Sequence, residues 1–558
     1  MFFRTASALS AAVVLSAAAT SSYAQSVMTH HMRDEVRTGA AQPMAQMAKG
    51  QVMNLDLVLP LSDPAGLQSF LADIYNPSSP NFHHFLTVAE FTARFGPTQD
   101  QYAAVLQFAK AKGLAVTGGS RDGMDVQVKG TVAAVERAFG VRMAHYQRSE
   151  GGTYFAPDRE PSTDLPFNLW HVSGMDNYSI PHARLSRRSD FAASRGIEAE
   201  AVVNHATTGS GPQASFLGSD MRAAYATGTT LTGAGQTLGL LEFLGTDLVD
   251  LNNYYKQVGQ TNTVPITLIS TDGTSTSCVH SRAGGNCDDT EQTLDMTQAL
   301  GMAPGLASLQ VYVGSTDTAM ISAMVSHNPL PGTIGCSWGW TPADPKTLDP
   351  FFQRMAAQGQ NFFAASGDNS TWSRRNEAWP ADDANVISVG GTDLVTTGAG
   401  GAWQAETAWV DSGGGISPSP EKIAIPSYQK LAGVINNTNR GSKTLRNGPD
   451  VSANANFTFF TCANQTTCLA NQFGGTSFAA PMWAGLIALV NQKLAAEGKA
   501  SIGFLNPTIY SENVTAAFAT GFHDITSGTS GSFSAVTGYD LVTGWGSPKP
   551  GLIGELAP

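Results

Sequence analysis

Residues 474–481 have the sequence Gly-Gly-Thr-Ser-Phe-Ala-Ala-Pro, and an apolar run with helical spacing follows them. A serine held by small residues at the start of a helix has an exposed hydroxyl group, and the neighbouring backbone N–H groups point outward. Those groups can stabilise the negative charge that develops on an attacked carbonyl. Ser477 is therefore the candidate nucleophile. Taken alone, the same residues would also suit an ordinary helix cap.

A serine nucleophile needs a base, and the sequence offers acidic side chains at a suggestive spacing. Glu291 and Asp295 are four residues apart, which places both carboxylates on one face of a helix. Helix capping is a simpler interpretation, because Asp288-x-x-Glu291 also has a capping pattern. The second half of the chain has three histidines, none in a setting that suggests a catalytic triad: His280, His327 and His523.

The chain from residue 214 to residue 558 alternates short strand-like runs with helical segments. The clearest runs are Thr237–Leu241, Ser308–Val313, Asn361–Ala365 and Val386–Val389. This alternation is typical of a parallel sheet that is covered by helices on both faces. We predict an α/β domain with a doubly wound parallel sheet over residues 214–558.

Residues 43–185 show another pattern, which begins with alternating apolar residues from Gln51 to Leu59, the mark of a half-buried strand. The capping-box sequences Thr87-x-x-Glu90 and Thr98-x-x-Gln101 predict two helices. Further strands are expected near 114–117, 125–129 and 142–146, with a helix over 131–139. The order β, helices, β, β, α, β favours a ferredoxin-like α+β domain.

Residues 186–213 have little periodicity, contain Arg187, Arg188 and Arg195, and end in a Gly- and Ser-rich stretch. We interpret them as a linker. An exposed basic linker is a candidate region for proteolytic processing, although many such segments only connect domains.

Composition excludes several classes of protein. With 558 residues the chain exceeds the roughly 300 at which one core stops growing, so at least two domains are expected. A formal net charge of -12 gives no general attraction to nucleic acid.

Arg4, the apolar run after it and the small-residue sequence Ser22-Tyr23-Ala24 predict a signal peptide over residues 1–24. An N-terminal membrane anchor is the alternative, but the run is short for that. We expect a soluble secreted or periplasmic protein.

The five cysteines fit an exported protein. Cys278 with Cys287, and Cys462 with Cys468, are close enough in sequence to close small loops, which leaves Cys336 single. Each pair could instead be two reduced thiols. No Cys/His cluster has the spacing of a zinc site.

Combined with Glu291-x-x-Leu294-Asp295 and Ser366-Gly367-Asp368, the motif around Ser477 resembles the sedolisin family of serine-carboxyl peptidases, including its kumamolisin-like members. Further similar stretches are 336–339 (Cys-Ser-Trp-Gly), 389–392 (Val-Gly-Gly-Thr), 412–417 (Ser-Gly-Gly-Gly-Ile-Ser) and 449–452 (Pro-Asp-Val-Ser). Residues 79–87 and 130–140 resemble the activation prodomain of that family. The resemblance covers nearly the whole chain after the predicted signal peptide, and it implies a subtilisin-like peptidase domain.

The resemblance implies that Ser477 attacks the peptide carbonyl, Glu291 accepts its proton, Asp295 orients Glu291, and Asp368 completes the oxyanion site. A carboxylate can still accept a proton in acid, where a histidine is already charged. The carboxyl group of Asp368 can donate a hydrogen bond only while it is protonated. Activity is therefore expected in acid.

Two more residues, Glu242 and Trp338, match positions that extend the carboxyl network in some relatives, and a plain structural role for both stays open.

The resemblance also implies one structural Ca²⁺ ion. Its ligands would be the carboxylates of Asp524 and Asp540 and the backbone carbonyls of Ile525, Val536 and Gly538, the hard oxygen donors that calcium prefers. Relatives often have glycine where this chain has Val536, which leaves the donor atom but puts the loop shape in doubt. Apart from the resemblance, aspartates in Gly- and Ser-rich loops usually form turns.

Together these features predict a secreted, acid-active serine-carboxyl endopeptidase made as a self-processing zymogen. Its own prodomain would act as intramolecular chaperone and inhibitor, its substrates would be proteins or peptides, and a monomer is expected. Two alternatives stand beside this: a catalytically silent calcium-binding secreted protein, and a subtilisin-like Ser-His-Asp hydrolase. The sequence leaves open the subsite specificity, tripeptidyl release as against internal cleavage, the processing point and the physiological substrate.

Overall fold

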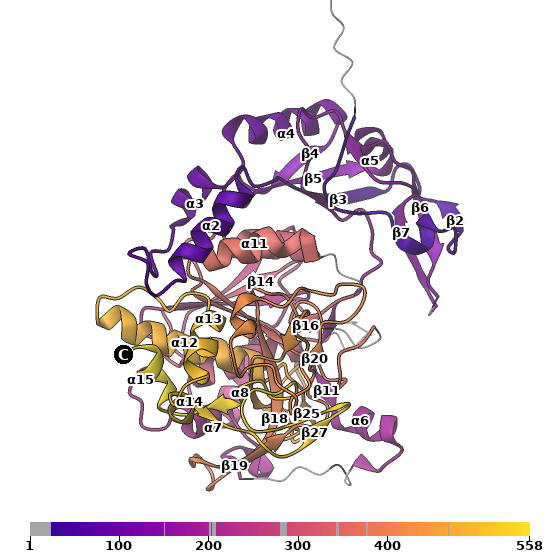
Figure 1. The fold of residues 1–558 in the computed structure, drawn as a ribbon. Coiled ribbons are helices and arrows are strands. Elements are labelled where there is room, and N and C mark those ends of the chain that lie inside the picture. Colours follow the sequence, from indigo (N-terminus) through magenta and orange to yellow (C-terminus); the bar gives the residue numbers. More distant parts are fainter. Residues whose placement is uncertain are drawn as a thin grey trace, which may run out of the picture.

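The computed structural model of the chain describes residues 24–149, 151–199, 202, 208–278, 287–341, 345–374, 378–466 and 468–558. Of the predicted signal peptide, only Ala24 lies within these ranges. His280 lies outside them. Figure 1 shows two units, with the N-terminal unit in indigo and violet stacked over a larger C-terminal unit.

The N-terminal unit is built on a four-stranded antiparallel sheet of order β4-β5-β3-β9. Alternate residues of β3 (Val52–Val58) and β5 (Asp125–Thr131) face α4 (Gln99–Lys112) and α5 (Val132–Phe139), and they form one apolar core with them. The opposite face of the same strands contacts the C-terminal unit through helix α10 (Asp317–Met324). This sheet and its helices agree with the predicted ferredoxin-like α+β domain.

The fourth strand of this sheet differs from the prediction. It is β9 (His171–Ser173), whereas the strand expected at 142–146 forms β6 (Met143–Gln147) in a separate sheet of order β2-β6-β7. Strand β6 pairs with β7 (Thr153–Pro157) across a tight connection that contains Gly151 and Gly152, both with positive φ. A three-residue strand such as β9 is too short to show periodicity.

The remaining elements of the N-terminal unit include both helices announced by capping boxes, and Thr87 and Thr98 cap them as expected. Their bounds are β1 (Gln25–Ser26), α1 (Asp34–Arg37), β2 (Pro43–Gln46), α2 (Pro64–Ile74), α3 (Val88–Arg94), β4 (Ala115–Gly118) and β8 (Ser162–Thr163).

The C-terminal unit contains an eight-stranded sheet of order β13-β14-β12-β15-β17-β18-β19, with β22 also paired to β18. All of its pairs are parallel except that of β18 with the edge strand β19. The strands are β12 (Thr237–Glu242), β13 (Ile266–Ser270), β14 (Ser308–Val313), β15 (Thr333–Cys336), β17 (Asn361–Ala365), β18 (Ile387–Thr396), β19 (Trp403–Ala408) and β22 (Val451–Asn454).

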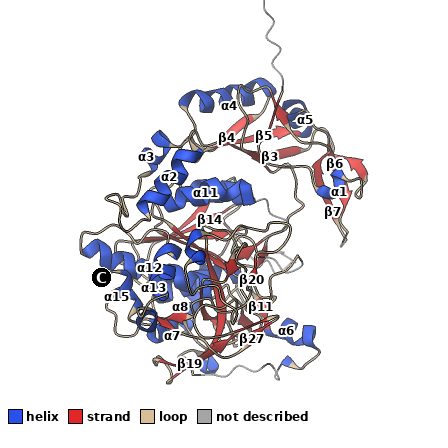
Figure 2. Ribbon diagram, in the orientation of Figure 1, coloured by secondary structure: helices blue, strands red, loops and turns tan. Residues whose placement is uncertain are grey.

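Helices cover both faces of this sheet, as predicted for a doubly wound fold (Figure 2). Residues of α7 (Gly218–Tyr225), α9 (Thr290–Met302) and α12 (Ala479–Ala496) pack on one face. Those of α10 (Asp317–Met324) and α11 (Pro345–Ala357) pack on the other. Strands of a parallel sheet are buried on both faces, which explains their nearly continuous apolar runs.

The other elements of the C-terminal unit are short and flank the sheet. They are α8 (Leu248–Gln257), β16 (Trp338–Gly339), β20 (Gly415–Ile416), β21 (Asn447–Gly448), β23 (Phe460–Thr461), β24 (Leu469–Ala470), β25 (Phe473–Gly474), α13 (Asn506–Asn513), α14 (Phe518–Gly521), β26 (Phe522–His523), β27 (Thr529–Ser530), β28 (Phe533–Ser534), β29 (Ser547–Pro548) and α15 (Leu552–Leu556).

Helices α9 and α12 approach each other closely at Gly485. A Cβ atom at that position would lie 3.0 Å from the carbonyl oxygen of Ala299 and 2.9 Å from the Cβ of Met302. Only glycine leaves room for this approach. It joins the second turn of α12 to the last turn of α9.

Helices α2 and α11 lie side by side at the junction of the two units (Figures 1 and 2). The Tyr75 hydroxyl group donates to the carbonyl of Ala356 at 2.8 Å and accepts from the backbone N–H of Phe504 at 2.7 Å. The Trp170 indole donates to the carbonyl of Lys346 at 2.9 Å. The N-terminal unit is therefore docked on the C-terminal unit by polar as well as apolar contacts.

The segment between the units contains β10 (His182–Ala183), β11 (Ser186–Arg187) and helix α6 (Arg188–Arg195), although its sequence shows little periodicity. Both expected disulfides are formed, Cys278–Cys287 and Cys462–Cys468, and Cys336 is a buried free thiol. Within the described ranges no helix has the length and apolar character needed to cross a bilayer.

Candidate active site

Ser477 lies just before helix α12 and is fully buried by the chain that covers it. Its hydroxyl group donates to the carbonyl of Ser337 at 3.3 Å. Gly475, with a φ of 142°, allows the sharp turn that leads into the helix. The serine thus has the position that the motif predicted, at the positive end of a helix dipole.

Glu291 and Asp295 lie on the first two turns of α9, and both are buried. Burial raises the pKa of Glu291 well above its usual range, while the hydroxyls of Ser477 and Ser337 act in the opposite direction. The hydroxyls lie near this carboxyl group, yet no described residue makes a hydrogen bond of normal geometry to either of its oxygens. The Ser337 hydroxyl donates to Asp295 Oδ1 at 2.7 Å. The structure therefore brings the two predicted carboxyl groups to Ser477.

Glu242 joins these carboxyl groups from the end of β12. The Trp338 indole donates to Glu242 Oε2 at 2.9 Å. Burial raises the pKa of Glu242 to about 8. Burial, followed by the charges of Glu242 and Glu291, also raises the pKa of Asp295. We call Glu242, Glu291 and Asp295 the cleft cluster; in it, neighbouring carboxylates resist ionising together.

Asp368 lies on the other side of the serine. Its Oδ1 accepts from the backbone N–H of Thr476 at 2.8 Å and from the Thr476 hydroxyl at 2.9 Å. Burial raises the pKa of Asp368 to about 7, so the protonated form persists in acid. No described residue makes a hydrogen bond to its Oδ2. This carboxyl group can act as a donor at the point where an oxyanion would form.

The capping interpretation of Asp288-x-x-Glu291 does not match the structure. Asp288 accepts from the N–H of Thr290 at 3.0 Å, and Asp289 is held by backbone N–H groups of Asp247 and Asn464. The Glu291 side chain makes no capping bond to the start of α9.

His327 and His523 lie within the described residues, and both contact side chains other than Ser477. His327 lies next to Gln310 Nε2 at 3.1 Å and packs edge-on against Tyr312. The ring of His523 stacks on Trp403, and burial lowers its pKa to about 4. Neither has a contact with Ser477, while His280 lies outside the described residues.

The segment between the two units occupies the cleft at Ser477. Strand β10 pairs antiparallel with β16, and β11 pairs antiparallel with β25. Between them, the Arg184 N–H donates to the Ser337 carbonyl at 2.7 Å, and the Ser477 N–H donates to the Arg184 carbonyl at 3.1 Å. The chain blocks its own cleft.

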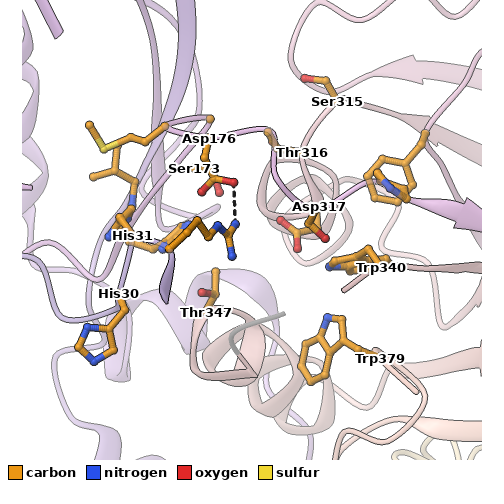
Figure 3. A pocket seen from close by; sticks show the side chains of 18 residues that line it. His30, His31, Ser173, Asp176, Ser315, Thr316, Asp317, Trp340, Thr347 and Trp379 are labelled. Carbon is orange, nitrogen blue, oxygen red and sulfur yellow. Dashed lines mark hydrogen bonds and ion pairs between the residues drawn. The ribbon is translucent and has the colours of Figure 1, made fainter. Parts of the chain in front are cut away.

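A polar pocket lies beside this cleft, where the N-terminal unit meets the C-terminal unit (Figure 3). His30, His31 and Asp176 line one side, and Asp317, Trp340 and Trp379 line the other. The His31 and His171 rings stack at 4.5 Å, and Arg33 pairs with Asp176 at 2.6 Å. Burial keeps the pKa of His171 well below its usual value.

The residues predicted to bind calcium form one loop cluster. Asp524 accepts from the Gly538 N–H, with distances of 3.1 and 3.2 Å to its two oxygens. Asp540 Oδ2 accepts from the Val536 N–H at 3.0 Å. The segment 536–538 thus lies between two buried or half-buried carboxyl groups, which burial makes harder to ionise. Two carboxylates flanked by backbone carbonyls fit a calcium ion.

The same cluster holds only two acidic side chains, and no group of three or more His, Cys, Asp or Glu suited to a metal is found among the described residues. Backbone carbonyls would have to supply most of the ligands. Ile525, at the start of this cluster, is buried.

Sequence reasoning gave no role to Ser337, Thr476 or Arg184. Ser337 links Asp295 to the backbone of Ser477, and Thr476 holds Asp368. Ser337 lies in the stretch 336–339, and Thr476 is next to the candidate nucleophile. Their proximity in sequence to these motifs is the signal that could have placed them in the site. Arg184 had no such signal, because only the tertiary structure brings it to the serine.

Two families match the chain. Residues 41–175 match the family described as pro-kumamolisin, activation domain, and residues 275–537 match the subtilase family. The first match falls on the N-terminal unit, and the second includes Glu291, Asp295, Asp368 and Ser477.

Several curated proteins are similar over most of the chain. Kumamolisin from Bacillus sp. (strain MN-32) is 30% identical over 82% of this chain and 83% of its own length. Sedolisin from Pseudomonas sp. (strain 101) is 29% identical over 92% of this chain and 88% of its own. Tripeptidyl-peptidase sed5 from Aspergillus fumigatus is 24% identical over 83% of this chain and 86% of its own.

Proposed function

Because the chain belongs to the sedolisin family of serine-carboxyl peptidases, we propose that it is an acid-active endopeptidase, secreted as a zymogen that processes itself. It is a serine-type peptidase with an activation prodomain. The observation that supports the finer proposal is the placement of Ser477 among buried carboxyl groups, with no described imidazole beside it.

In the proposed mechanism, Ser477 Oγ attacks the substrate carbonyl carbon while Glu291 takes the hydroxyl proton. The tetrahedral oxyanion is stabilised by the Ser477 N–H and by the protonated carboxyl group of Asp368. Glu291 then returns the proton to the leaving amine, and an ester on Ser477 remains. Water hydrolyses this ester with Glu291 again acting as base. Asp295 positions Glu291.

Acid suits this arrangement for two reasons. Burial raises the pKa of all three carboxyl groups in the cleft cluster, so acid leaves Asp295 and Glu242 protonated and uncharged. Without charged neighbours to repel it, one carboxylate of the cluster can still form, and we propose that Glu291 carries it. Asp368 keeps its proton below about pH 7 and loses the donor role above that value. An imidazole base would be charged and inactive in the same medium.

Cleavage within a chain is favoured over release of terminal tripeptides by the path of the bound segment. It pairs with β16 on one side of Ser477 and with β25 on the other, and the chain continues in both directions. A cleft that accepts residues on both sides of the serine suits an internal peptide bond.

The prodomain, residues 43–185, would act as chaperone and inhibitor, joined by the linker 186–213 to the peptidase domain 214–558. Its sheet packs against the peptidase unit, and its last residues, in β10, block the cleft. The predicted signal peptide supports export, and we propose that the mature enzyme acts as a monomer on protein or peptide substrates.

One calcium ion would be held by Asp524 and Asp540 together with the carbonyls of Ile525, Val536 and Gly538. When bound, the ion would tie together the loops that lead to the C-terminal helix α15. A chelator is expected to lower the Tm of the mature enzyme, and added Ca²⁺ is expected to restore it. Asp540→Asn should remove that calcium dependence.

Acidification of the purified precursor tests the proposal. At about pH 4, near the usual carboxyl pKa, the wild type should convert to a shorter active form. Ser477→Ala should stay intact, while Ser511→Ala, an exposed serine on α13, should convert normally. Equal conversion in Ser477→Ala would mean that a contaminating protease is responsible.

The two alternatives predict other outcomes. A catalytically silent protein would remain intact and inert in acid. A Ser-His-Asp hydrolase would lose acid proteolysis when one of His280, His327 or His523 is replaced, and its activity would peak in alkaline buffer. Either result would overturn the serine-carboxyl mechanism.

A further inference from the structure

Residues 182–187 lie in the cleft as a substrate would. His182 is paired with Gly339 and Ala183 with Trp338, and beyond the serine Ser186 is paired with Gly474. Antiparallel pairing on both sides fixes the register of this segment, since a shift by one residue would turn every side chain to the opposite face.

This register places one peptide bond at the nucleophile. The Arg184 carbonyl oxygen accepts from the Ser477 N–H at 3.1 Å. This N–H is one of the two proposed oxyanion donors, so the Arg184 carbonyl lies where the attacked carbonyl of a substrate would lie. The Arg184 carbonyl oxygen and Asp368 Oδ2 both lie within 2.5 Å of the point that a Cβ at Gly475 would occupy. Because these distances are 2.3 and 2.5 Å, the two oxygens are at most about 5 Å apart.

The Arg184 side chain fills a pocket next to this bond and is only 4% exposed. Its Nη2 donates to the Trp379 carbonyl at 3.3 Å. The guanidinium group also lies over Gly339, where a Cβ would be 1.8 Å from Nη2 and 2.2 Å from Cζ. Glycine at 339 thus provides the room that arginine needs. We call this space the arginine pocket.

Charge in the surroundings is compatible with a cation. The guanidinium charge lowers the pKa of Asp368 and so opposes the larger effect of burial. It also lowers the pKa of Cys336, against burial and the charges of Asp295 and Glu242. A positive side chain in the arginine pocket is therefore attracted to these acidic side chains when they are ionised, and among the described residues it meets no other cation when they are protonated in acid.

We propose that the zymogen first cuts the bond between Arg184 and Leu185, and that the mature enzyme prefers substrates with arginine immediately before the cleaved bond. This rests on the proposed function. Ser477 Oγ bonds to the Arg184 carbonyl carbon, and its proton passes through Glu291 to the Leu185 nitrogen as the C–N bond breaks. Water then cleaves the ester, leaving a carboxylate on Arg184 and a free amine on Leu185.

The position of the first cut can be read by mass spectrometry and N-terminal sequencing during a short acid incubation of the full chain. The earliest products should end at Arg184 and begin at Leu185. The rate should not depend on protein concentration, because the reaction is intramolecular. Earliest products cut at another bond would overturn the assignment.

Two Arg→Glu variants distinguish an effect of the arginine pocket from an effect of net charge. Arg184→Glu should slow the first cut about 10-fold or more, because the shorter side chain loses the guanidinium donor to the Trp379 carbonyl and leaves the arginine pocket partly empty. Arg137→Glu, the same change at an exposed arginine on α5 far along the chain from this segment, should change the rate less than about 3-fold. Equal slowing in both variants would contradict the arginine pocket.

Mature wild-type enzyme provides a test that does not depend on folding of the variants. Peptides that differ only in the residue before the scissile bond should be cleaved with a kcat/KM about 10-fold or more higher for arginine than for leucine or glutamate. Gly339→Ala should reduce this preference while cleavage of an alanine peptide persists. No preference for arginine would overturn the proposal, whereas absence of all hydrolysis would instead contradict the proposed function.

Discussion

Asp56 and Asp125 on the prodomain sheet can be compared with the cleft cluster, since burial raises the carboxyl pKa values in both places. Asp56 on β3 lies opposite Gln127 on β5, and Asp125 is two residues away on the same face. We call Asp56 and Asp125 the interface pair, because the hydroxyls of Thr318 and Ser322 on α10 interact with them.

The difference between the two groups lies in their neighbours. Glu291 lies near a serine at the start of a long helix, and a bound chain presents a peptide carbonyl to the same serine. The interface pair instead faces the hydroxyls of Thr318 and Ser322 on α10, which donate to the Ser173 hydroxyl at 2.8 Å and to the Gly123 carbonyl at 2.9 Å. Perturbed carboxyl groups indicate chemistry only where a nucleophile and an oxyanion site accompany them.

The largest expected effect is on kcat, and it distinguishes the cleft cluster from the interface pair. Glu291→Gln should lower kcat of the mature enzyme by about 10²- to 10⁴-fold, because the proton of Ser477 loses its acceptor. Asp56→Asn, the matched change in the interface pair, should leave kcat unchanged once the prodomain is removed. Steady-state hydrolysis of one peptide by both enzymes checks this, and similar losses in both would remove the distinction.

Asp368→Asn addresses the oxyanion side of the site. The protonated carboxyl group donates below its pKa of about 7 and stops donating as the pH rises through that value. An amide donates at every pH, so the variant should keep its activity further into alkaline solution. Its kcat at acid pH should fall by about 10²-fold, the usual cost of a disturbed oxyanion donor. A pH–rate profile with an unchanged alkaline limb would argue against this role.

The interface pair should instead affect the stability of the zymogen. The pKa of Asp56 is higher in the folded protein than its usual value of 3.8. The stabilisation that protonated Asp56 gives the folded zymogen is therefore complete below pH 3.8 and is lost as the pH rises toward the raised pKa. In a Ser477→Ala background, Asp56→Asn should raise the Tm at pH 7 by about 2 to 4 °C and have little effect near pH 3.

Asp100→Asn, an exposed aspartate on α4, is the control for that measurement and should leave the Tm unchanged. A lower Tm for Asp56→Asn at pH 7 would show that the ionised pair stabilises the interface.

The smallest expected effect concerns His171, whose lowered pKa acts in the opposite direction. Its contribution to the closed zymogen is complete above about pH 6.5 and is lost as the pH falls toward the lowered value. Its neighbours are Thr29, His31 and Arg33, and Glu160 lies beyond His31. His171→Gln should move the pH of half-maximal processing down by about half a unit. An upward shift would contradict this sign.

Local patterns in the sequence predicted local structure well. The capping boxes at Thr87 and Thr98 begin helices, and the spacing of Glu291 and Asp295 predicted their common face. The parallel sheet followed from the alternation of strands and helices. These features depend on residues within a few turns of one another, where chain geometry alone decides which side chains meet.

Long-range placement escaped the sequence. Strand β9 is too short to show a pattern, and β6 joins another sheet although it forms where expected. The contact of Arg184 with Ser477 joins residues that are far apart in the chain, and it depends on how two units dock. No periodicity encodes such a contact, because it is decided by tertiary packing.

The anchoring of the chain after Leu185 has a consequence for maturation. Helix α6 is held to the peptidase unit by Phe191, whose ring packs on Phe457 at 5.0 Å. Arg195 pairs with Asp411 at 2.5 Å, and the Arg188 N–H donates to the Gln472 carbonyl at 2.8 Å. A single cut at Arg184 would therefore free only the half of the cleft that β10 fills.

The new amino terminus would stay tethered in the other half and compete with every incoming substrate. Full turnover would then require a second trimming step downstream of α6, and the once-cut form would be a slow, self-occupied intermediate.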